Sequence, residues 1–119
     1  ACIAMSSTEA EIIAASACAQ ELVYFTKLAS EMGLPQSRVK LFVDNSGAVE
    51  LSRDRKSCHR SRHVDRRYFK VRELVAEGLI TVEHIDTADN AADVMTKAVE
   101  QVAFSKHCRR IFNLETIYE

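Results

Sequence analysis

Residues 39–46 read Val39-Lys40-Leu41-Phe42-Val43-Asp44-Asn45-Ser46, and this stretch decides the fold class. Its first five residues are β-branched, aromatic or long apolar side chains around one lysine, a composition that predicts a short strand. The apolar run stops at Asp44, and Asn45 and Ser46 are residues that commonly begin helices. The stretch therefore predicts a buried strand with polar groups at its carboxyl end, followed by a short helix to about Leu51.

A long helix is predicted before this strand, over residues 8–32. Apolar side chains recur there at three- and four-residue intervals, and Thr8 and Glu11 have the spacing of a capping box. Gly33 and Pro35 follow in the order that ends helices. Residues 2–6 are mostly apolar and predict the end of another strand. Two aromatic residues of the long helix are expected to be packed: Tyr24 and Phe25.

After residue 51 the chain alternates between polar segments, helices and one further strand. The pattern predicts a loop at 52–60, a helix at 62–77 that Gly78 ends, a strand at 79–85, and helices at 91–98 and 100–112. The last helix carries Phe104, Cys108 and Ile111 on one side. This order of elements predicts an α/β fold. The strands are few for the number of helices, so we expect further strands on the N-terminal side.

Basic residues are concentrated in one segment, although the 119 residues carry a net charge of only −1. Segment 53–72 holds nine Lys and Arg residues against two Asp, whereas the rest of the chain is acidic. Such a strip predicts contact with a phosphate backbone or an acidic protein surface, and the alternative is a solvated helix face. The candidate phosphate contacts are Arg53, Arg55, Lys56, Arg60, Arg62 and Arg66.

Hydropathy and cysteine spacing argue against two classes of protein, integral membrane proteins and proteins held together by disulfide bonds. No apolar run approaches the roughly 20 residues that cross a bilayer, so we expect no membrane insertion. The four cysteines lie far apart and form no Cys-x-x-Cys pair. That spacing is typical of reduced, mostly buried thiols, so we expect an intracellular protein without a disulfide framework.

Three carboxylates lie at the ends of predicted elements, where the ligand sites of α/β sheets form. Glu11 lies in the first turns of the long helix, Asp44 directly follows the strand, and Asp93 begins a later helix. Grouped carboxylates can hold two Mg²⁺ ions, which activate water and stabilise the leaving oxygen of a phosphodiester. Acids near helix starts also act as caps and as partners of the helix dipole, and composition and spacing alone favour that role.

Four motifs, in this order, resemble the ribonuclease H domain of copia-type retrotransposon polyproteins. They are Ser6-Ser7-Thr8-Glu9-Ala10-Glu11, Phe42-Val43-Asp44-Asn45-Ser46-Gly47-Ala48, Arg62-His63-Val64-Asp65-Arg66-Arg67-Tyr68-Phe69 and Asn90-Ala91-Ala92-Asp93-Val94-Met95-Thr96-Lys97. The resemblance implies a ribonuclease H-like mixed sheet with flanking helices, of which residues 1–119 form a part. It also implies two-metal hydrolysis of the RNA strand of RNA/DNA hybrids, with Mg²⁺ as the cofactor.

The resemblance gives the catalytic and metal-binding roles to Glu11, Asp44 and Asp93. Glu11 matches the family's helix glutamate because the apolar residues that match the motif follow it directly. His84 resembles the mobile histidine that assists some ribonucleases H. It falls within a predicted strand, so we expect a packed, non-catalytic side chain.

The same resemblance places the family's first catalytic aspartate, and the central strand of its sheet, upstream of Ala1. Val39–Val43 would then have an unpaired edge, which folded proteins avoid. We therefore expect these residues alone to be inactive. The alternative is a domesticated, non-catalytic structural or interaction subunit of a larger assembly, in which a protein partner covers the open sheet edge near Val39–Val43.

The enzyme hypothesis predicts an RNA/DNA hybrid as the partner, held by the basic strip at 53–72. The predicted helix at 62–77 also carries aromatic and apolar residues. We expect four of them to face the core or an interface instead of forming a stacking platform for nucleobases: Tyr68, Phe69, Val71 and Leu74.

Overall fold

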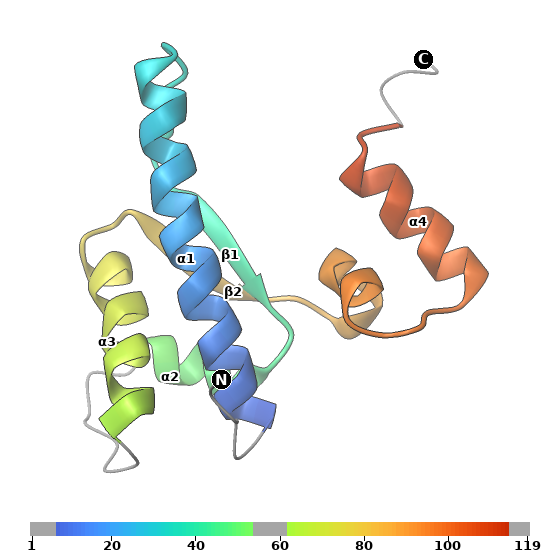
Figure 1. Cartoon of the computed structure of the whole chain (residues 1–119), viewed down its shortest axis with the longest axis horizontal. Helices are drawn as coiled ribbons and strands as arrows, with labels where there is room; N and C mark the ends of the chain where they lie inside the picture. Colours follow the sequence, from blue (N-terminus) through green and yellow to red (C-terminus); the bar gives the residue numbers. More distant parts are fainter. Residues whose placement is uncertain (1–6, 54–61, 115–119) are drawn as a thin grey trace. The chain divides into compact units, whose positions relative to one another are not determined.

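The computed structural model describes residues 7–53 and 62–114, apart from the side chains of 50–53, 62–65 and 68. The elements, in chain order, are α1 (Ser7–Glu31), β1 (Val39–Val43), α2 (Ser46–Arg53), α3 (Arg62–Ala76), β2 (Ile80–His84), the 3₁₀ helices η1 (Thr87–Asp89) and η2 (Ala91–Met95), and α4 (Gln101–Ile111) (Figure 1). This order confirms the α/β class. The predicted strand at residues 2–6 lies outside the described residues.

The chain divides into two compact units, Ala1–His84 and Ile85–Glu119. In the first unit β1 and β2 form a parallel pair, with Val39 opposite Ile80 and Val43 opposite His84. Parallel strands need a crossover connection, which α2 and α3 provide here. Because the strands run in the same direction, their carboxyl ends lie at the same edge of the sheet.

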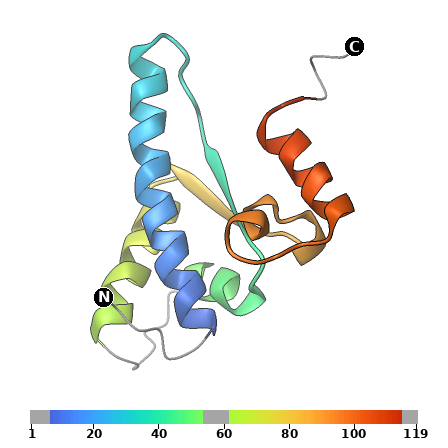
Figure 2. The same ribbon diagram turned by 45° about the vertical axis from the view of Figure 1, so that its right-hand side comes forward.

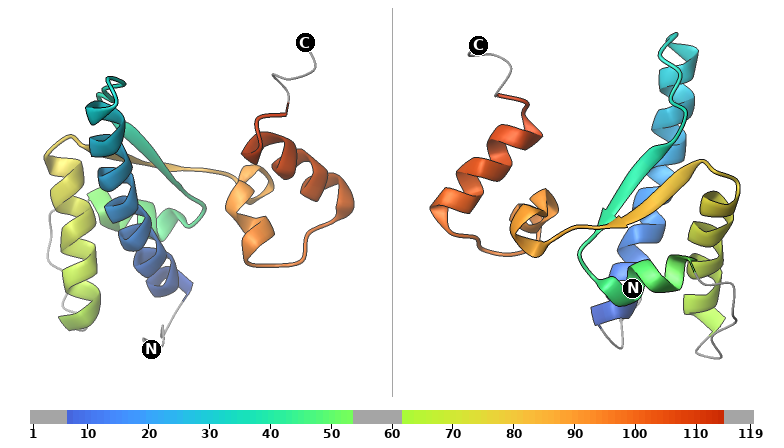
Figure 3. Two further views of the ribbon diagram at one scale, coloured as in Figure 1. Left: turned by 45° about the horizontal axis from the view of Figure 1, so that its top comes forward. Right: turned by 180° about the vertical axis from the view of Figure 1, so that it is seen from behind.

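The core of the first unit lies between one face of this sheet and its helices. Figures 1 and 3 show α1 and α3 lying along the same face of the strands. Alternate strand residues point toward these helices, as the period of two requires. The buried apolar residues are Ile12, Ala19, Leu41, Val43, Ala48, Val49, Val71, Leu74, Ile80 and Val82.

Helix α1 buries a narrow stripe of mostly small residues. Ile12, Ser16 and Ala19 follow at four- and three-residue intervals and are buried where α1 packs against α3. Tyr24 and Phe25 are 61% and 58% exposed, so the expectation that they are packed is wrong. Both lie off the buried stripe and in the C-terminal turns, which extend past the start of β1 (Figure 2). A helix of 25 residues is about 37 Å long, whereas a strand of five spans about 17 Å.

Glycine ends both long helices of the first unit, as the sequence predicts. Gly33 and Gly78 have φ angles of 81° and 72°, in the left-handed region where side chains are rarely tolerated. The residue after each glycine donates its backbone N–H to a carbonyl five residues back: Leu34 to Ala29 at 2.8 Å and Leu79 to Leu74 at 3.1 Å. These bonds satisfy carbonyls that the end of the helix leaves without a partner.

The second unit differs from the predicted pair of α-helices. The predicted α-helix at 91–98 is instead the short 3₁₀ helix η2. The reason is local, because the Asn90 side chain accepts a hydrogen bond from the Ala92 N–H at 3.2 Å and Asp93 N–H bonds to the Asn90 carbonyl. Such side-chain bonds favour tight turns over an α-helical ladder. In the first unit, α2 continues to Arg53, whereas the sequence predicts a loop from residue 52 onward.

The three residues that the sequence places on one side of the last helix do not form its buried side in α4. Phe104 and Ile111 are exposed and Cys108 is half-buried, whereas His107 is only 2% exposed. In this unit α4 packs against η2, and that contact selects which side of the helix is covered. Cys18 on α1 is exposed too, which contradicts the expectation of mostly buried thiols. Across residues 7–53 and 62–114, no helix combines the length and apolarity that a membrane span requires.

Candidate functional site

The carboxyl end of β1 is joined to the first turn of α1 by Asn45. Its Oδ1 accepts a hydrogen bond from the Ala48 N–H at 3.0 Å, which caps α2. Its Nδ2 donates to Thr8 Oγ1 at 3.4 Å. Gly47 completes the close approach, because a Cβ there would lie 3.2 Å from Asn45 Oδ1 and 3.6 Å from Thr8 Cγ2. The predicted cap of α2 is therefore confirmed, and it also ties two distant parts of the chain together.

Two of the three candidate acids belong to this junction. Asp44 is the residue between β1 and Asn45, and Glu11 follows Thr8 by three residues on α1. Residues three apart on a helix lie on one side of it, so Glu11 shares the side of α1 that faces Asn45. Both carboxyl side chains are half-buried. The first unit therefore brings Glu11 and Asp44 to one end of the sheet, the end where ligands of α/β folds gather.

His84 lies at the same end of the sheet. It is the last residue of β2 and pairs in register with Val43, the residue before Asp44. The prediction that it lies in a strand is confirmed. The prediction that it is packed is wrong, because His84 is exposed. Sequence reasoning could not show this, since the exposure depends on where the strand ends.

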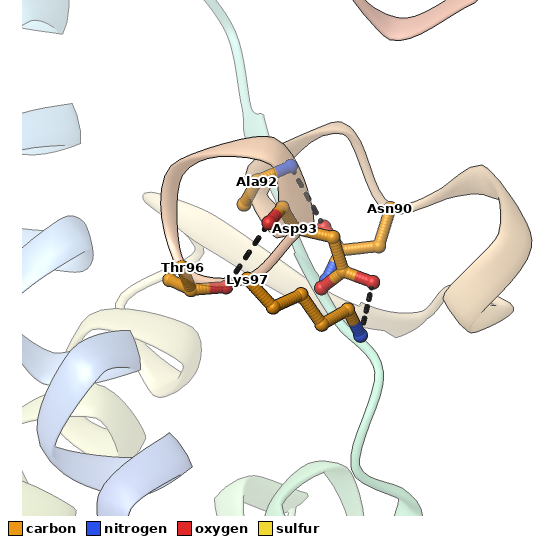
Figure 4. A network of polar contacts seen from close by, with 5 residues as sticks. All are labelled: Asn90, Ala92, Asp93, Thr96 and Lys97. Atoms are coloured by element: carbon orange, nitrogen blue, oxygen red, sulfur yellow. Dashed lines mark hydrogen bonds and ion pairs between the residues drawn. The ribbon is translucent and has the colours of Figure 1, made fainter. Parts of the chain in front are cut away.

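Asp93 belongs to the second unit, within η2, where it takes part in a network of polar contacts (Figure 4). Its side chain is buried, with 7% of the residue exposed. The Lys97 ammonium contacts one carboxylate oxygen at 2.6 Å, and Asn90 Nδ2 donates to the other at 3.3 Å. The backbone carbonyl of Asp93 also accepts a hydrogen bond, from the Thr96 hydroxyl at 3.3 Å, and this bond closes the turn. Asp93 thus lies in the first turn of η2 with a bound counter-ion, whereas the cap of this helix is Asn90. Lys97 is a site residue that the sequence reasoning missed, although its four-residue spacing from Asp93 was a usable signal.

The donor chemistry of these residues suits magnesium. Mg²⁺ prefers carboxylate and water oxygens, and commonly takes only one or two protein carboxylates. Glu11 and Asp44 are two such groups within the first unit. Asp93 lies in the second unit, where its carboxylate is paired with Lys97. Within the described part of the chain, no three His, Cys, Asp or Glu side chains group as a metal cluster.

The basic strip is described only in part. Arg55, Lys56 and Arg60 lie outside the described residues, as do the side chains of Arg53 and Arg62. Arg66 is exposed on α3 and directs a cation toward solvent. The same helix buries Val71 and Leu74, as expected, but Phe69 is 55% exposed and faces no core.

Comparisons with known proteins point to one kind of relative. The chain is 33% identical over 115 residues, 97% of its length, to the retrovirus-related Pol polyprotein from transposon TNT 1-94 of Nicotiana tabacum, and covers 9% of it. It is 33% and 30% identical, over 110 residues each, to those from transposons RE2 and RE1 of Arabidopsis thaliana. In both cases the match covers 92% of this chain and 8% of the relative. No model of a protein family matches the chain, and no solved structure does.

Proposed function

We propose that this chain, which is homologous to a segment of retrotransposon Pol polyproteins, hydrolyses the RNA strand of RNA/DNA hybrids by ribonuclease H-type chemistry. The relatives confirm the retrotransposon origin that the four motifs predict. The chain spans less than a tenth of the length of these relatives, and the nuclease activity is our inference. The observation that carries it is the hydrogen bond between Asn45 and Thr8, which brings Glu11 and Asp44 to one end of the sheet.

The proposed roles follow from the position of each acid. Glu11 and Asp44 would hold Mg²⁺ at the end of β1, where Asn45 joins the first turn of α1 to the start of α2. Bound Mg²⁺ lowers the pKa of a coordinated water and stabilises the leaving oxygen of a phosphodiester. The resemblance gives Asp93 a third metal-binding role. The structure describes Asp93 only within the second unit, where its contact with Lys97 neutralises the buried charge.

The basic strip supplies the affinity for the hybrid. Arg53, Arg55, Lys56, Arg60, Arg62 and Arg66 neutralise phosphates and so position the nucleic acid without reading its sequence. Discrimination of a hybrid from a DNA duplex requires contacts to RNA 2′-hydroxyls in addition. The strip therefore accounts for binding, and the acids account for chemistry.

Hybrid cleavage with and without Asp44 tests the proposal. The assay uses an RNA/DNA hybrid with Mg²⁺, and compares the chain alone with the chain joined to the polyprotein segment that precedes the matched region in a relative. We expect cleavage from the longer form, and a loss of about a hundredfold or more in Asp44→Asn or Glu11→Gln. The matched control is Glu21→Gln, an exposed acid farther along α1.

Two results would contradict the proposal. One is a longer form that folds and binds the hybrid but leaves its RNA strand intact. The other is cleavage that persists at the same rate in Asp44→Asn and Glu11→Gln. In either case the acids at the end of β1 have the structural role that their spacing also permits.

A further inference from the structure

One side of α3 carries a shallow basic hollow with an aromatic ring in it. Arg66, Phe69, Lys70 and Glu73 follow at three- and four-residue spacing and line a hollow of about 360 Å³. Val71 lies on the opposite, buried side of the helix. The four residues therefore form a solvent-facing stripe that the core does not use.

The ring of Phe69 is the unusual member of this stripe. It is 55% exposed, and the guanidinium of Arg72 lies over it at 5.8 Å from the ring centroid. A cation at that distance interacts favourably with the ring. Phe25 on α1 is equally exposed, but its ring meets Tyr24 edge-on at 5.6 Å, and it is not among the residues that line this hollow. Exposure alone is therefore common to both rings, and the basic surroundings distinguish Phe69.

The charge of the hollow selects an anionic ligand. Arg66 and Lys70 are exposed cations, and Glu73 is the one acid among the four lining residues. Glu73 pairs with the Lys70 ammonium at 2.8 Å, so the Arg66 charge remains uncompensated within the stripe. Arg67 and Arg72, next to the stripe on the same helix, add further positive charge.

A ligand that fits must present a flat aromatic face together with negative charge. An acidic peptide supplies negative charge, but its acidic side chains carry no aromatic ring held at a fixed distance from that charge. A nucleic-acid duplex presents phosphates, but its bases are stacked on one another and cannot reach Phe69. An unpaired nucleotide has both parts, because its base can stack on an aromatic ring while its phosphates meet Arg and Lys.

We propose that the stripe Arg66, Phe69, Lys70 and Glu73 binds single-stranded nucleic acid by stacking a base on Phe69. The expectation that Phe69 faces the core or an interface is thereby replaced. The site does not depend on the proposed hydrolysis, since it uses neither the acids at the end of β1 nor a metal ion. It gives α3 a contact with an unpaired stretch of strand, in addition to the duplex contacts proposed for the basic strip.

Fluorescence anisotropy with labelled oligonucleotides tests the site. The probes are an oligo(dT) and an oligo(rU) of about 12 nucleotides, and a blunt RNA/DNA hybrid of the same length. We expect Phe69→Leu to weaken binding of a single strand about fivefold to tenfold and to change hybrid binding by less than about twofold. Phe25→Leu, which removes an equally exposed ring, leaves both unchanged.

Two further variants separate stacking from a structural effect. Phe69→Trp keeps an aromatic face and should retain or increase single-strand affinity. Glu73→Gln removes the acid that pairs with Lys70 and should strengthen binding of both single strands and hybrid. If Phe69 had only a structural role, its replacement would change the free energy of unfolding. That role predicts neither the retained affinity of Phe69→Trp nor the stronger binding of Glu73→Gln.

The outcomes are distinguishable. A preference for the oligo(dT) or the oligo(rU) probe identifies whether the site binds single-stranded DNA or single-stranded RNA. Absence of single-strand binding, equal affinity of Phe69→Leu and the unaltered chain, or an equal loss in Phe25→Leu overturns the proposal. An equal loss for strand and hybrid in Phe69→Leu also overturns it. None of these results alters the cleavage assay, so this site and the proposed nuclease function fail or stand separately.

Discussion

Asn45 stabilises the first unit through two different hydrogen bonds of one side chain. The amide oxygen caps α2 and the amide nitrogen reaches Thr8 on α1. An asparagine is suited to this because it carries an acceptor and donors on the same planar group. The residue before it, Asp44, is thereby held at the end of β1. A single side chain thus links local helix capping to the geometry of the candidate site.

Replacing Asn45 with alanine removes both bonds. The first N–H groups of α2 lose their cap, and we expect the free energy of unfolding to fall by about 1–2 kcal/mol. Urea denaturation followed by circular dichroism measures the change. Asn45→Ser is the control, because a serine oxygen can still cap the helix and most of the stability should remain. An alanine variant as stable as the unaltered chain would show that the cap contributes nothing.

At the scale of elements, α4 is anchored to the turn η1 by charged side chains. The Lys106 ammonium contacts Asp89 Oδ1 at 2.6 Å, and Arg110 donates to the Asp89 carbonyl at 3.2 Å. The hydrogen bond and the charge of Lys106 lower the pKa of Asp89, and Arg110 and His107 act in the same direction. Both groups of the pair are exposed, so salt screens the contact. The pair orients α4 within the second unit more than it stabilises the fold.

The sign of the pH dependence follows from this lowered pKa. A carboxyl that ionises more easily in the folded chain contributes stability above its unfolded pKa of about 3.9. That contribution is lost as the pH falls below about 3.9 through the lowered folded value. We expect an NMR titration of the Asp89 carboxyl carbon to show the lowered pKa, and Lys106→Met to return it toward the ordinary value.

Lys97→Met is the matched control for that titration. It removes an ammonium of the same unit that pairs with Asp93 instead of Asp89. The pKa of Asp89 should be unchanged in this variant. If Lys106→Met leaves the pKa of Asp89 lowered, the ion pair between α4 and η1 does not form in solution.

At the scale of the whole molecule, the charge is distributed unevenly along the chain. The net charge is −1, yet nine basic residues are confined to segment 53–72. A protein with an evenly spread charge near zero would have little attraction for phosphates. For the hybrid binding that we propose, the region expected to contact phosphates is therefore segment 53–72.

Salt dependence measures how many cations of the strip contact phosphates. If all six candidate residues each neutralise one phosphate, the logarithm of the hybrid binding constant falls with the logarithm of salt concentration with a slope of about −5. Replacing Arg53, Arg55 and Lys56 together with glutamine should reduce that slope by about 3 in magnitude. Anisotropy titrations of the hybrid over a series of salt concentrations provide the measurement.

The control removes the same number of charges elsewhere. Replacing Lys27, Lys40 and Arg109 with glutamine lowers the net charge equally but leaves segment 53–72 intact. This variant should keep the slope of the unaltered chain. An equal reduction of the slope in the two triple variants would mean that overall charge, and not the strip, controls binding.

Local patterns determined the elements and the residues that end them. The helix α1, the strand β1 and the stops at Gly33 and Gly78 were predictable because apolar spacing and left-handed glycines act within a few residues. The cap at Asn45 was predictable for the same reason. Where a local side-chain hydrogen bond competes with the helix, as at Asn90, the predicted α-helix was wrong.

Burial was decided only by the tertiary structure, because it depends on what each element packs against. Tyr24 and Phe25 are exposed because α1 is longer than the sheet, and His107 is buried because η2 covers its side of α4. The contact between Thr8 and Asn45 joins residues 37 positions apart, which no local pattern reveals. The sequence by itself thus determined the retroelement motifs, the elements and their acids. The three-dimensional packing decided that Glu11 and Asp44 share one end of the sheet and that the Phe69 ring faces solvent, since both follow from long-range contacts.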